Sequence, residues 1–141
     1  MTEFALIYPM LAMVALTTSV LVILFLSRVR AVREGKVTLG YFKTFQGQIE
    51  PSYTAKPARH FANLFEAPVL FYAVCLAAMI TQSSGPTMIV LAWTYVAARV
   101  GHALIHLGSN QVRARVGAYF GGWLALLGMW TYLAVCVASR G

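Results

Sequence analysis

The chain has 141 residues, of which 60% are hydrophobic and only 11% are charged, and its formal net charge is +7. Soluble domains carry about 25% charged residues, whereas several apolar runs here exceed the ~18 residues that indicate a membrane span. The composition therefore excludes an ordinary soluble domain and predicts an integral membrane protein, whose basic excess reflects topology and anionic lipid headgroups rather than nucleic acid.

The first apolar run covers residues 4–27 and predicts a retained transmembrane helix. The run is longer than the apolar core of a signal peptide, and Glu3 precedes it instead of a lysine or arginine. Pro9 falls in the first turns of this helix, where a proline is tolerated. We expect no cleavage after this span.

Residues 28–57 form the only long segment that is expected outside the membrane. Glycines and Pro51 interrupt it, and aromatic residues such as Tyr41 and Phe42 are interleaved with its charges. Two interpretations remain open, a basic loop that lies on lipid headgroups and a flap over the mouth of a site. The six cations of the segment are Arg28, Arg30, Arg33, Lys36, Lys43 and Lys56.

The second span is predicted over residues 58–82 and carries polar side chains in its first half. Arg59, Asn63 and Glu66 are spaced by four and three residues, which places them on one face of a helix. Glu66 lies in an apolar run, where a carboxylate is costly and requires a partner. It is either one half of a structural ion pair or one wall of a polar site.

Prolines mark the limits and the shape of the second and third spans. Pro57 suits the first position of the second helix, and Pro86 starts the third span. Pro68 cannot donate a backbone hydrogen bond, so it predicts a kink two residues past Glu66.

The third span, residues 86–107, has a polar stripe of its own. Tyr95, Arg99, His102 and His106 recur at helical spacing and share one face. Arg113 and Arg115 follow this span. The fourth span is predicted over residues 116–138, and Gly117 and Gly121 form a GxxxG pattern that favours close helix contact.

The distribution of lysine and arginine predicts the topology. Seven of these residues follow the first span, counted up to and including Arg59. None lies between the second and third spans, and two lie between the third and fourth spans. Cytoplasmic loops are the basic ones, so both termini are expected on the opposite side of the membrane. Glu66 and Arg99 then lie at similar depths, ~10 and ~12 Å from the same surface, and we expect them to form an ion pair.

Toward the cytoplasm, cations outnumber Glu66 and predict an anion-binding pocket with one carboxylate that can receive an amine. Composition leaves glutathione, a phospholipid headgroup and an acidic metabolite open. Glutathione fits because arginines bind carboxylates in forked pairs, Glu66 can take the ammonium, and a cation beside the sulfur favours the reactive thiolate. The residues expected around the pocket are Arg59, Asn63, Glu66, Arg99, His102, His106, Arg113 and Arg115.

The order and spacing of these motifs resembles the MAPEG family, the membrane-associated proteins in eicosanoid and glutathione metabolism. The resemblance implies one membrane domain over residues 1–141, an all-α four-helix up-down bundle, and a homotrimer that binds glutathione between protomers near the cytoplasmic face. It implies that Arg115 lies near the thiol as the catalytic residue. The motifs that carry the resemblance are Arg59-x3-Asn63-x2-Glu66-x-Pro68, Arg99-x2-His102-x3-His106-Leu107-Gly108 and Arg113-x-Arg115.

Three positions differ from the prostaglandin E synthase branch of that family. Ala62 replaces a second arginine, His106 a tyrosine and Val116 a serine. We therefore expect a bacterial-type member in the inner membrane that acts as a glutathione transferase, or as a peroxidase-like enzyme, on apolar electrophiles. The alternative is a non-catalytic scaffold or lipid-binding protein on the same fold, with itself, lipids or apolar small molecules as partners.

Other classes of protein fit the residues less well. His102 and His106, with His60, suggest a metal or haem site, but the neighbouring arginines disfavour a cation, and we expect no metal. A small multidrug transporter requires an unpaired central carboxylate, whereas Arg99 is expected beside Glu66. The chain contains no CxxC motif, and we interpret its two cysteines as packing residues.

Overall fold

The computed structural model describes residues 4–109 and 111–140, and within this part the regular structure is helical throughout. Four helical rods are each long and apolar enough to cross a membrane, which confirms the expected all-α four-helix membrane bundle. The first rod is α1 (Ile7–Arg33), the second combines α3 (Ser52–Asn63) and α4 (Ala67–Ile80), and the last two are α5 (Pro86–Leu107) and α6 (Val112–Ala138). The remaining helix, α2 (Tyr41–Thr44), is a single turn.

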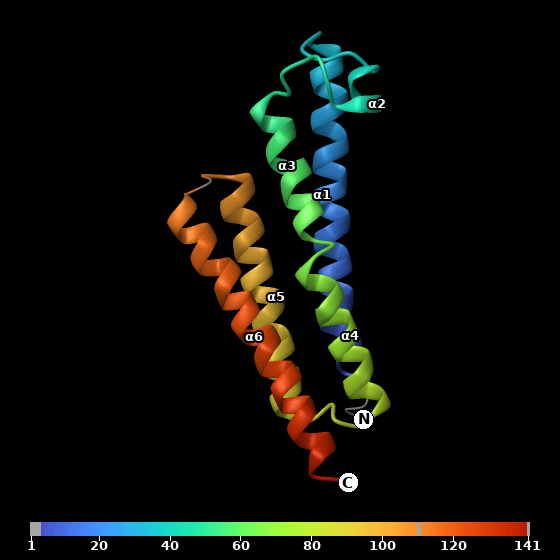
Figure 1. Cartoon of the computed structure of the whole chain (residues 1–141), viewed down its shortest axis with the longest axis vertical. Coiled ribbons are helices and arrows are strands. Elements are labelled where there is room, and N and C mark those ends of the chain that lie inside the picture. Colours follow the sequence, from blue (N-terminus) through green and yellow to red (C-terminus); the bar gives the residue numbers. More distant parts are fainter. Residues whose placement is uncertain (1–3, 110, 141) are drawn as a thin grey trace.

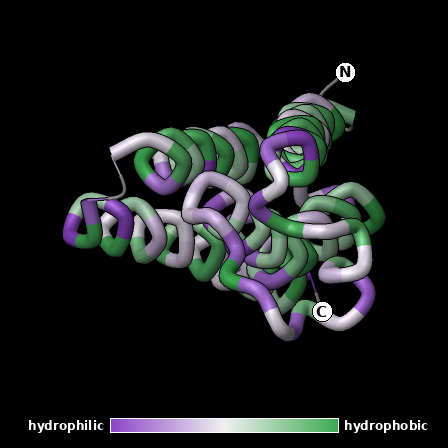
Figure 2. The backbone as a smooth tube through the Cα atoms, turned by 90° about the horizontal axis from the view of Figure 1, so that it is seen from above, coloured by the Kyte–Doolittle hydropathy of each residue, from purple (hydrophilic) through white to green (hydrophobic). Residues whose placement is uncertain are grey.

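The rods run alternately up and down (Figure 1). The start of α1, the turn from α4 to α5 and the end of α6 lie at one end of the molecule, and α2 lies at the other, which we call the loop end. α5 and α6 form the most closely packed pair, while α1 packs chiefly on α3. Figure 2 looks down on the loop end and shows hydrophilic stretches in the nearest segments, with hydrophobic helix behind them.

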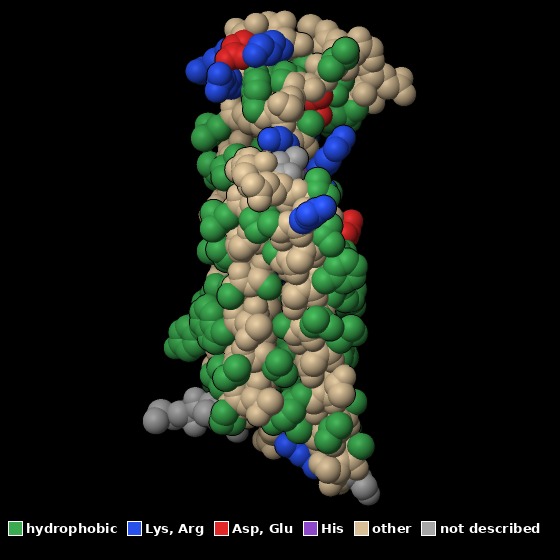
Figure 3. Space-filling model, turned by 90° about the vertical axis from the view of Figure 1, so that its left-hand side faces the viewer, with side chains coloured by type: hydrophobic (Ala, Val, Ile, Leu, Met, Phe, Trp, Pro, Cys, Tyr) green, Lys and Arg blue, Asp and Glu red, His purple; other side chains and the backbone are tan. Residues whose placement is uncertain are grey.

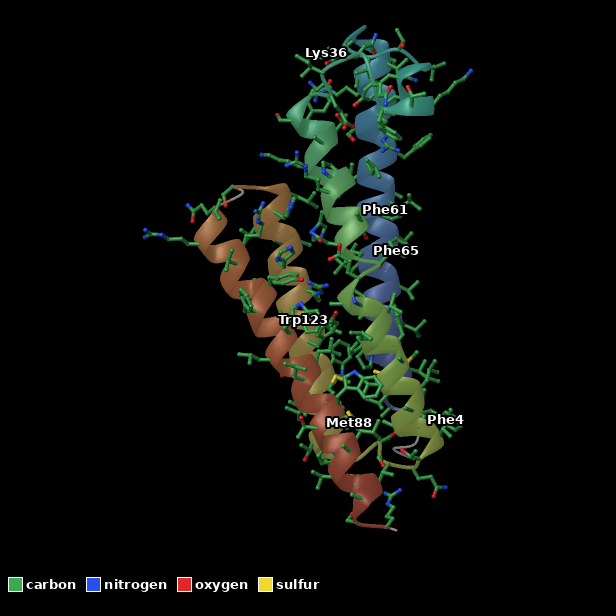
Figure 4. All side chains as sticks on the ribbon, in the orientation of Figure 1. Phe4, Lys36, Phe61, Phe65, Met88 and Trp123 are labelled. Carbon is green, nitrogen blue, oxygen red and sulfur yellow. The ribbon has the colours of Figure 1, made fainter. Side chains whose placement is uncertain are left out.

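The bundle core is apolar and receives side chains from every rod. Phe71 and Tyr95 stack with their ring centroids 4.6 Å apart, and Met13, Met88 and Leu126 are fully buried around them; Met88 is labelled in Figure 4. Hydrophobic side chains also cover much of the outer surface of the rods, whereas most of the visible charges gather at the loop end (Figure 3). This apolar outer surface is what a bilayer requires.

The second rod is interrupted between Asn63 and Ala67, so the kink that was expected past Glu66 lies before Pro68 instead. Pro68 is the second residue of α4, and a proline there excludes a regular helical turn at the carbonyl of Leu64, four residues earlier. Glu66 takes φ −94° and ψ −96°, which ends the continuous helical path. The break therefore separates Asn63 from Glu66.

The second rod also begins six residues earlier than expected, at Ser52 rather than at residue 58. Pro57 lies inside α3 and is not its first residue, which corrects the prediction. The carbonyl of Pro51 accepts hydrogen bonds from the amides of Thr54 and Ala55, both at 3.0 Å, and from the Thr54 hydroxyl at 2.7 Å. These bonds hold the first turn of α3, and the φ angle of Pro51, −59°, is already in the helical range.

The segment between the first two rods is more ordered than the expected loop. α1 continues to Arg33, and Val37 and Tyr41 pack on Ala31 in a small apolar cluster. Glu34 accepts hydrogen bonds from Arg30 at 2.6 Å, from Lys36 at 2.9 Å and from the Tyr53 hydroxyl at 2.8 Å. The bond from Arg30, with those from Lys36 and Tyr53, lowers the pKa of the Glu34 carboxyl to about 2.

Candidate functional site

A cavity of about 480 Å³ lies between α3, α5 and α6. In Figure 4, nitrogen-bearing side chains face one another in this part of the molecule. A second cavity of about 270 Å³ adjoins it and is lined by Ser52, Ala55, Lys56, Arg59, His106 and Arg115. The first cavity, which we call the cationic pocket, is lined by Arg59, Ala62, Asn63, His102, His106, Arg115, Val116, Tyr119 and Phe120.

Five of the eight expected site residues line the cationic pocket: Arg59, Asn63, His102, His106 and Arg115. They come from three helices. The helical spacings predicted which of them share a face, and the up-and-down order of the helices predicted that these faces lie at the same end of the bundle. Among the described residues, the lining of both cavities contains cations, histidines, one amide, two hydroxyls and apolar groups but no carboxylate. The pocket can therefore bind an anion, or a ligand whose negative charges exceed its positive ones.

Arg99 lies behind the cationic pocket and does not line it. The side chain is only 2% exposed, its Nε donates to the Tyr95 hydroxyl at 3.1 Å, and its Nη2 donates to the Asn63 carbonyl at 3.4 Å. The guanidinium carbon lies 5.6 Å and 5.7 Å from the ring centroids of Tyr95 and Tyr119. Neutral oxygens and aromatic faces thus hold this buried charge.

The expected ion pair between Glu66 and Arg99 is absent from the single chain. Glu66 is exposed, and neither described ion pair includes either residue. The physical reason is the interruption before Pro68, which leaves Glu66 outside the helix that carries Asn63. Arg113 is also exposed and does not line the pocket.

Three histidines form a buried cluster against the cationic pocket. His60 is 1% exposed, and its ring centroid lies 5.3 Å from that of His102 and 5.1 Å from that of His106. His102 Nδ1 lies 3.2 Å from the carbonyl of Arg115, which can only accept, so this nitrogen carries the proton and links α5 to the start of α6. Over residues 4–109 and 111–140, no three potential ligands are arranged to hold a metal ion.

Tyr119 and Phe120 form an aromatic wall of the pocket that the motifs in the sequence did not predict. Tyr119 lies four residues after Arg115 and thus on the same face of α6, a signal that was available. Its ring centroid lies 5.8 Å from that of His102. Nothing in the local pattern distinguishes Phe120 from the other apolar residues of α6.

The glycines of α6 have two different environments. A Cβ atom at Gly117 or Gly121 would meet nothing within 4 Å, so the GxxxG pattern makes no close contact inside the chain. At Gly122, in contrast, a Cβ would lie 3.6 Å from Cδ of Arg99 and 3.7 Å from Cβ of Ala98. The close approach of α6 to α5 therefore occurs at Gly122, and the GxxxG face remains open.

No curated protein and no solved structure shows significant similarity to the chain. The family model of the MAPEG family, however, matches residues 6–135, which include nearly all of the four rods. Together with the four apolar helices, this match shows that the chain is an integral, multi-pass membrane protein that belongs to the MAPEG family.

Proposed function

We propose that the protein binds glutathione in the cationic pocket and activates its thiol toward apolar electrophiles, as a transferase or a peroxidase-like enzyme. The observation that carries this proposal is the charge of the pocket. Arg59 and Arg115 line it with two histidines, and no described carboxylate does. Its volume of about 480 Å³ lies in the range of small-molecule sites, roughly 300–1,000 Å³.

The functional groups of glutathione suit the lining. Arg59 can bind a carboxylate in a forked pair, and Asn63 offers an amide to the peptide groups. Val116 and Phe120 supply an apolar wall beside the cations, where an apolar co-substrate can lie. The known biology of the family, glutathione and eicosanoid metabolism, agrees with this ligand.

Arg115 is the residue that we assign to the thiol. It lies in the first turns of α6, where the partly positive end of the helix adds to its charge, and both favour a thiolate. In a transfer, the sulfur would form a bond to an electrophilic carbon while the displaced group departs with the bonding electron pair. In peroxide reduction, two glutathione molecules would be oxidised to the disulfide while the peroxide is reduced to an alcohol and water.

We further propose that the site is completed in a homotrimer. Glu66 is exposed in the single chain between Phe65 and Val69, whose exposed fractions are 58% and 53%. A carboxylate among lipid-facing side chains is costly unless protein or water covers it. A neighbouring copy against this face would place Glu66 at the edge of the pocket, where it can bind the ammonium of glutathione. The number three rests on the likeness to the MAPEG family.

The site is proposed to face the cytoplasm from the inner membrane of a bacterium, with both termini on the other side. The support is the excess of lysine and arginine at the loop end, seven residues against none in the turn from α4 to α5. A reporter that is active only in the cytoplasm should be inactive when it is fused to the C-terminus. An active fusion would reverse the assigned orientation.

Calorimetric titration of the purified protein in detergent tests glutathione binding. Arg59→Ala should weaken the affinity roughly ten- to hundredfold, the effect of losing a charge-assisted hydrogen bond. Arg115→Ala should leave the affinity within a few fold but should weaken the thiolate absorbance of bound glutathione near neutral pH. Arg113→Ala removes the same charge two residues away without touching the pocket, and should change neither quantity.

The outcomes separate the competing functions. If wild-type protein binds glutathione but shows no thiolate signal at saturation, the enzymatic proposal loses its mechanism. If glutathione does not bind at all, the non-catalytic scaffold or lipid-binding alternative is the better explanation.

Native mass spectrometry from mild detergent tests the homotrimer. Gly117→Leu and Gly121→Leu place large side chains on the open face of α6, where a Cβ atom meets nothing within 4 Å inside the chain. Each should shift a trimer toward monomer, while the helical content remains unchanged. A wild-type protein that is only monomeric or dimeric would contradict the proposed assembly.

A further inference from the structure

A separate apolar crevice of about 380 Å³ lies where α1 meets the segment around α2. It shares no lining residue with the cationic pocket or with the cavity beside it. Its walls are almost entirely apolar, and two arginines are the charged groups among them. The crevice is lined by Phe25, Arg28, Val29, Val32, Arg33, Leu39 and Phe42.

Arg28 is held in this crevice without a counter-charge. Its guanidinium carbon lies 5.1 Å from the ring centroid of Phe42 and 5.5 Å from that of Phe45. Its Nε is buried and has no hydrogen-bond partner within the chain. Glu34 pairs with Arg30 and Lys36 instead, and no described carboxylate forms an ion pair with Arg28. Aromatic faces therefore position a cation that still has donors for a ligand.

The position of Arg28 along α1 places it at the surface of the bilayer. Arg28 lies 21 residues after Ile7, a rise of about 32 Å, and the hydrocarbon core of a bilayer is about 30 Å thick. Phe25, one turn earlier, is 63% exposed on the membrane side of Arg28, and Leu39 is 75% exposed at the rim. The crevice thus extends from the level of acyl chains to the level of headgroups.

We propose that this crevice binds one anionic phospholipid of the adjoining leaflet. An acyl chain lies along Phe25, Val29 and Leu39, and the headgroup phosphate accepts hydrogen bonds from Arg28, with Arg33 at the rim. The lining offers no carboxylate to the ammonium of a zwitterionic headgroup. The charge of the crevice therefore selects a lipid with net negative charge, such as phosphatidylglycerol, over phosphatidylcholine.

Native mass spectrometry of the full chain in neutral detergent tests the proposal. Titration with phosphatidylglycerol should give one saturable adduct, and phosphatidylcholine with the same acyl chains should bind at least about fivefold more weakly. Arg28→Gln should weaken the phosphatidylglycerol adduct about fivefold, as expected for one cation at a membrane surface. Lys43→Gln is the matched control, because Lys43 is exposed on α2 but does not line the crevice.

A second variant tests the apolar part of the site and does not alter the charge. Val29→Trp fills the crevice but retains Arg28, and it should also weaken the adduct, while circular dichroism shows unchanged helix. If Arg28→Gln does not fold, Val29→Trp still tests whether the lipid binds in the crevice, because an adduct of unchanged strength in that variant would contradict the proposal.

Three results would overturn the proposal. Equal binding of the two lipids would show that headgroup charge is not selected. Equal losses in Arg28→Gln and Lys43→Gln would show general attraction by the basic segment. Adducts on monomers that are absent from oligomers would show that a second copy of the chain occupies the crevice.

Discussion

Two charged regions of this molecule hold their charges in different ways, one at the exposed loop end and one inside the bundle. At the loop end, Glu34 accepts hydrogen bonds from Arg30, Lys36 and Tyr53, in contact with water. Inside the bundle, Arg99 is 2% exposed and is held by a hydroxyl, a backbone carbonyl and two aromatic rings. In the first region a carboxylate contacts the two cations and neutralises one of them, whereas the second keeps its positive charge beside a pocket that is lined by further cations.

The difference indicates which region orders the chain and which can bind a ligand. Exposed ion pairs contribute little to stability because water screens them. The cluster at Glu34 therefore links the end of α1 to the start of α3 through the Tyr53 hydroxyl, and it contributes little to the stability of the bundle. A cation inside a membrane protein is costly and characteristically marks a functional site. Because neutral groups hold Arg99, its charge is not cancelled and contributes to the positive potential of the cationic pocket.

The largest expected effect comes from removing the oxygen that holds Arg99. Tyr95→Phe leaves the Nε of Arg99 without its acceptor in a fully buried position, and should lower the free energy of unfolding by ~1–3 kcal/mol. Titration with a denaturing detergent, followed by circular dichroism, measures this change. Tyr119→Phe is the control, since its ring face contacts Arg99 and survives the substitution. Equal losses in the two variants would show that the Tyr95 hydroxyl is not the stabilising partner.

A smaller effect is expected for the coupling energy between Glu66 and Arg99, which distinguishes contacts within one chain from contacts between copies. Because Glu66 and Arg99 form no ion pair in the single chain, Glu66→Gln and Arg99→Leu should be additive in monomeric protein to within ~0.5 kcal/mol. The double-mutant cycle, measured by the same detergent titration, gives the coupling energy. Strong coupling in the monomer would show that Glu66 and Arg99 do form an ion pair within one chain. Coupling that occurs only in the assembled protein would show that the contact lies between copies.

The smallest expected effect is the titration of Glu34. The pKa of this carboxyl is lowered from 4.5 to about 2, so its stabilising contribution is complete above pH 4.5 and is lost as the pH falls through 2. The carboxyl ¹³C shift of Glu34, followed by nuclear magnetic resonance, reports the midpoint. Tyr53→Phe removes one donor and should move the midpoint upward. A midpoint near 4.5 in the wild-type protein would show that the cluster does not form in solution.

The amino-acid sequence alone predicts the four spans, the helical class and five of the nine residues that line the cationic pocket. Hydrophobicity along the chain is a local property, so the apolar runs predict which residues enter the bilayer without reference to packing. Helical spacing then placed Arg59 with Asn63 and His102 with His106, and the alternating direction of the rods brought these pairs to the same end of the bundle as Arg115. All five residues line the cationic pocket.

The environments of the two most costly charges, Arg99 and Glu66, depend on the tertiary structure, which forms no ion pair with either of them among the described residues. Helical spacing tells which residues share a face, but it does not set the rotation of that face against its neighbours, so Arg99 lies behind the pocket with Tyr95. The interruption between α3 and α4 separates Glu66 from the face of Asn63. Where a helix ends within a span depends on how its unpaired backbone groups are satisfied, and a pattern that assumes one continuous helix cannot contain that information.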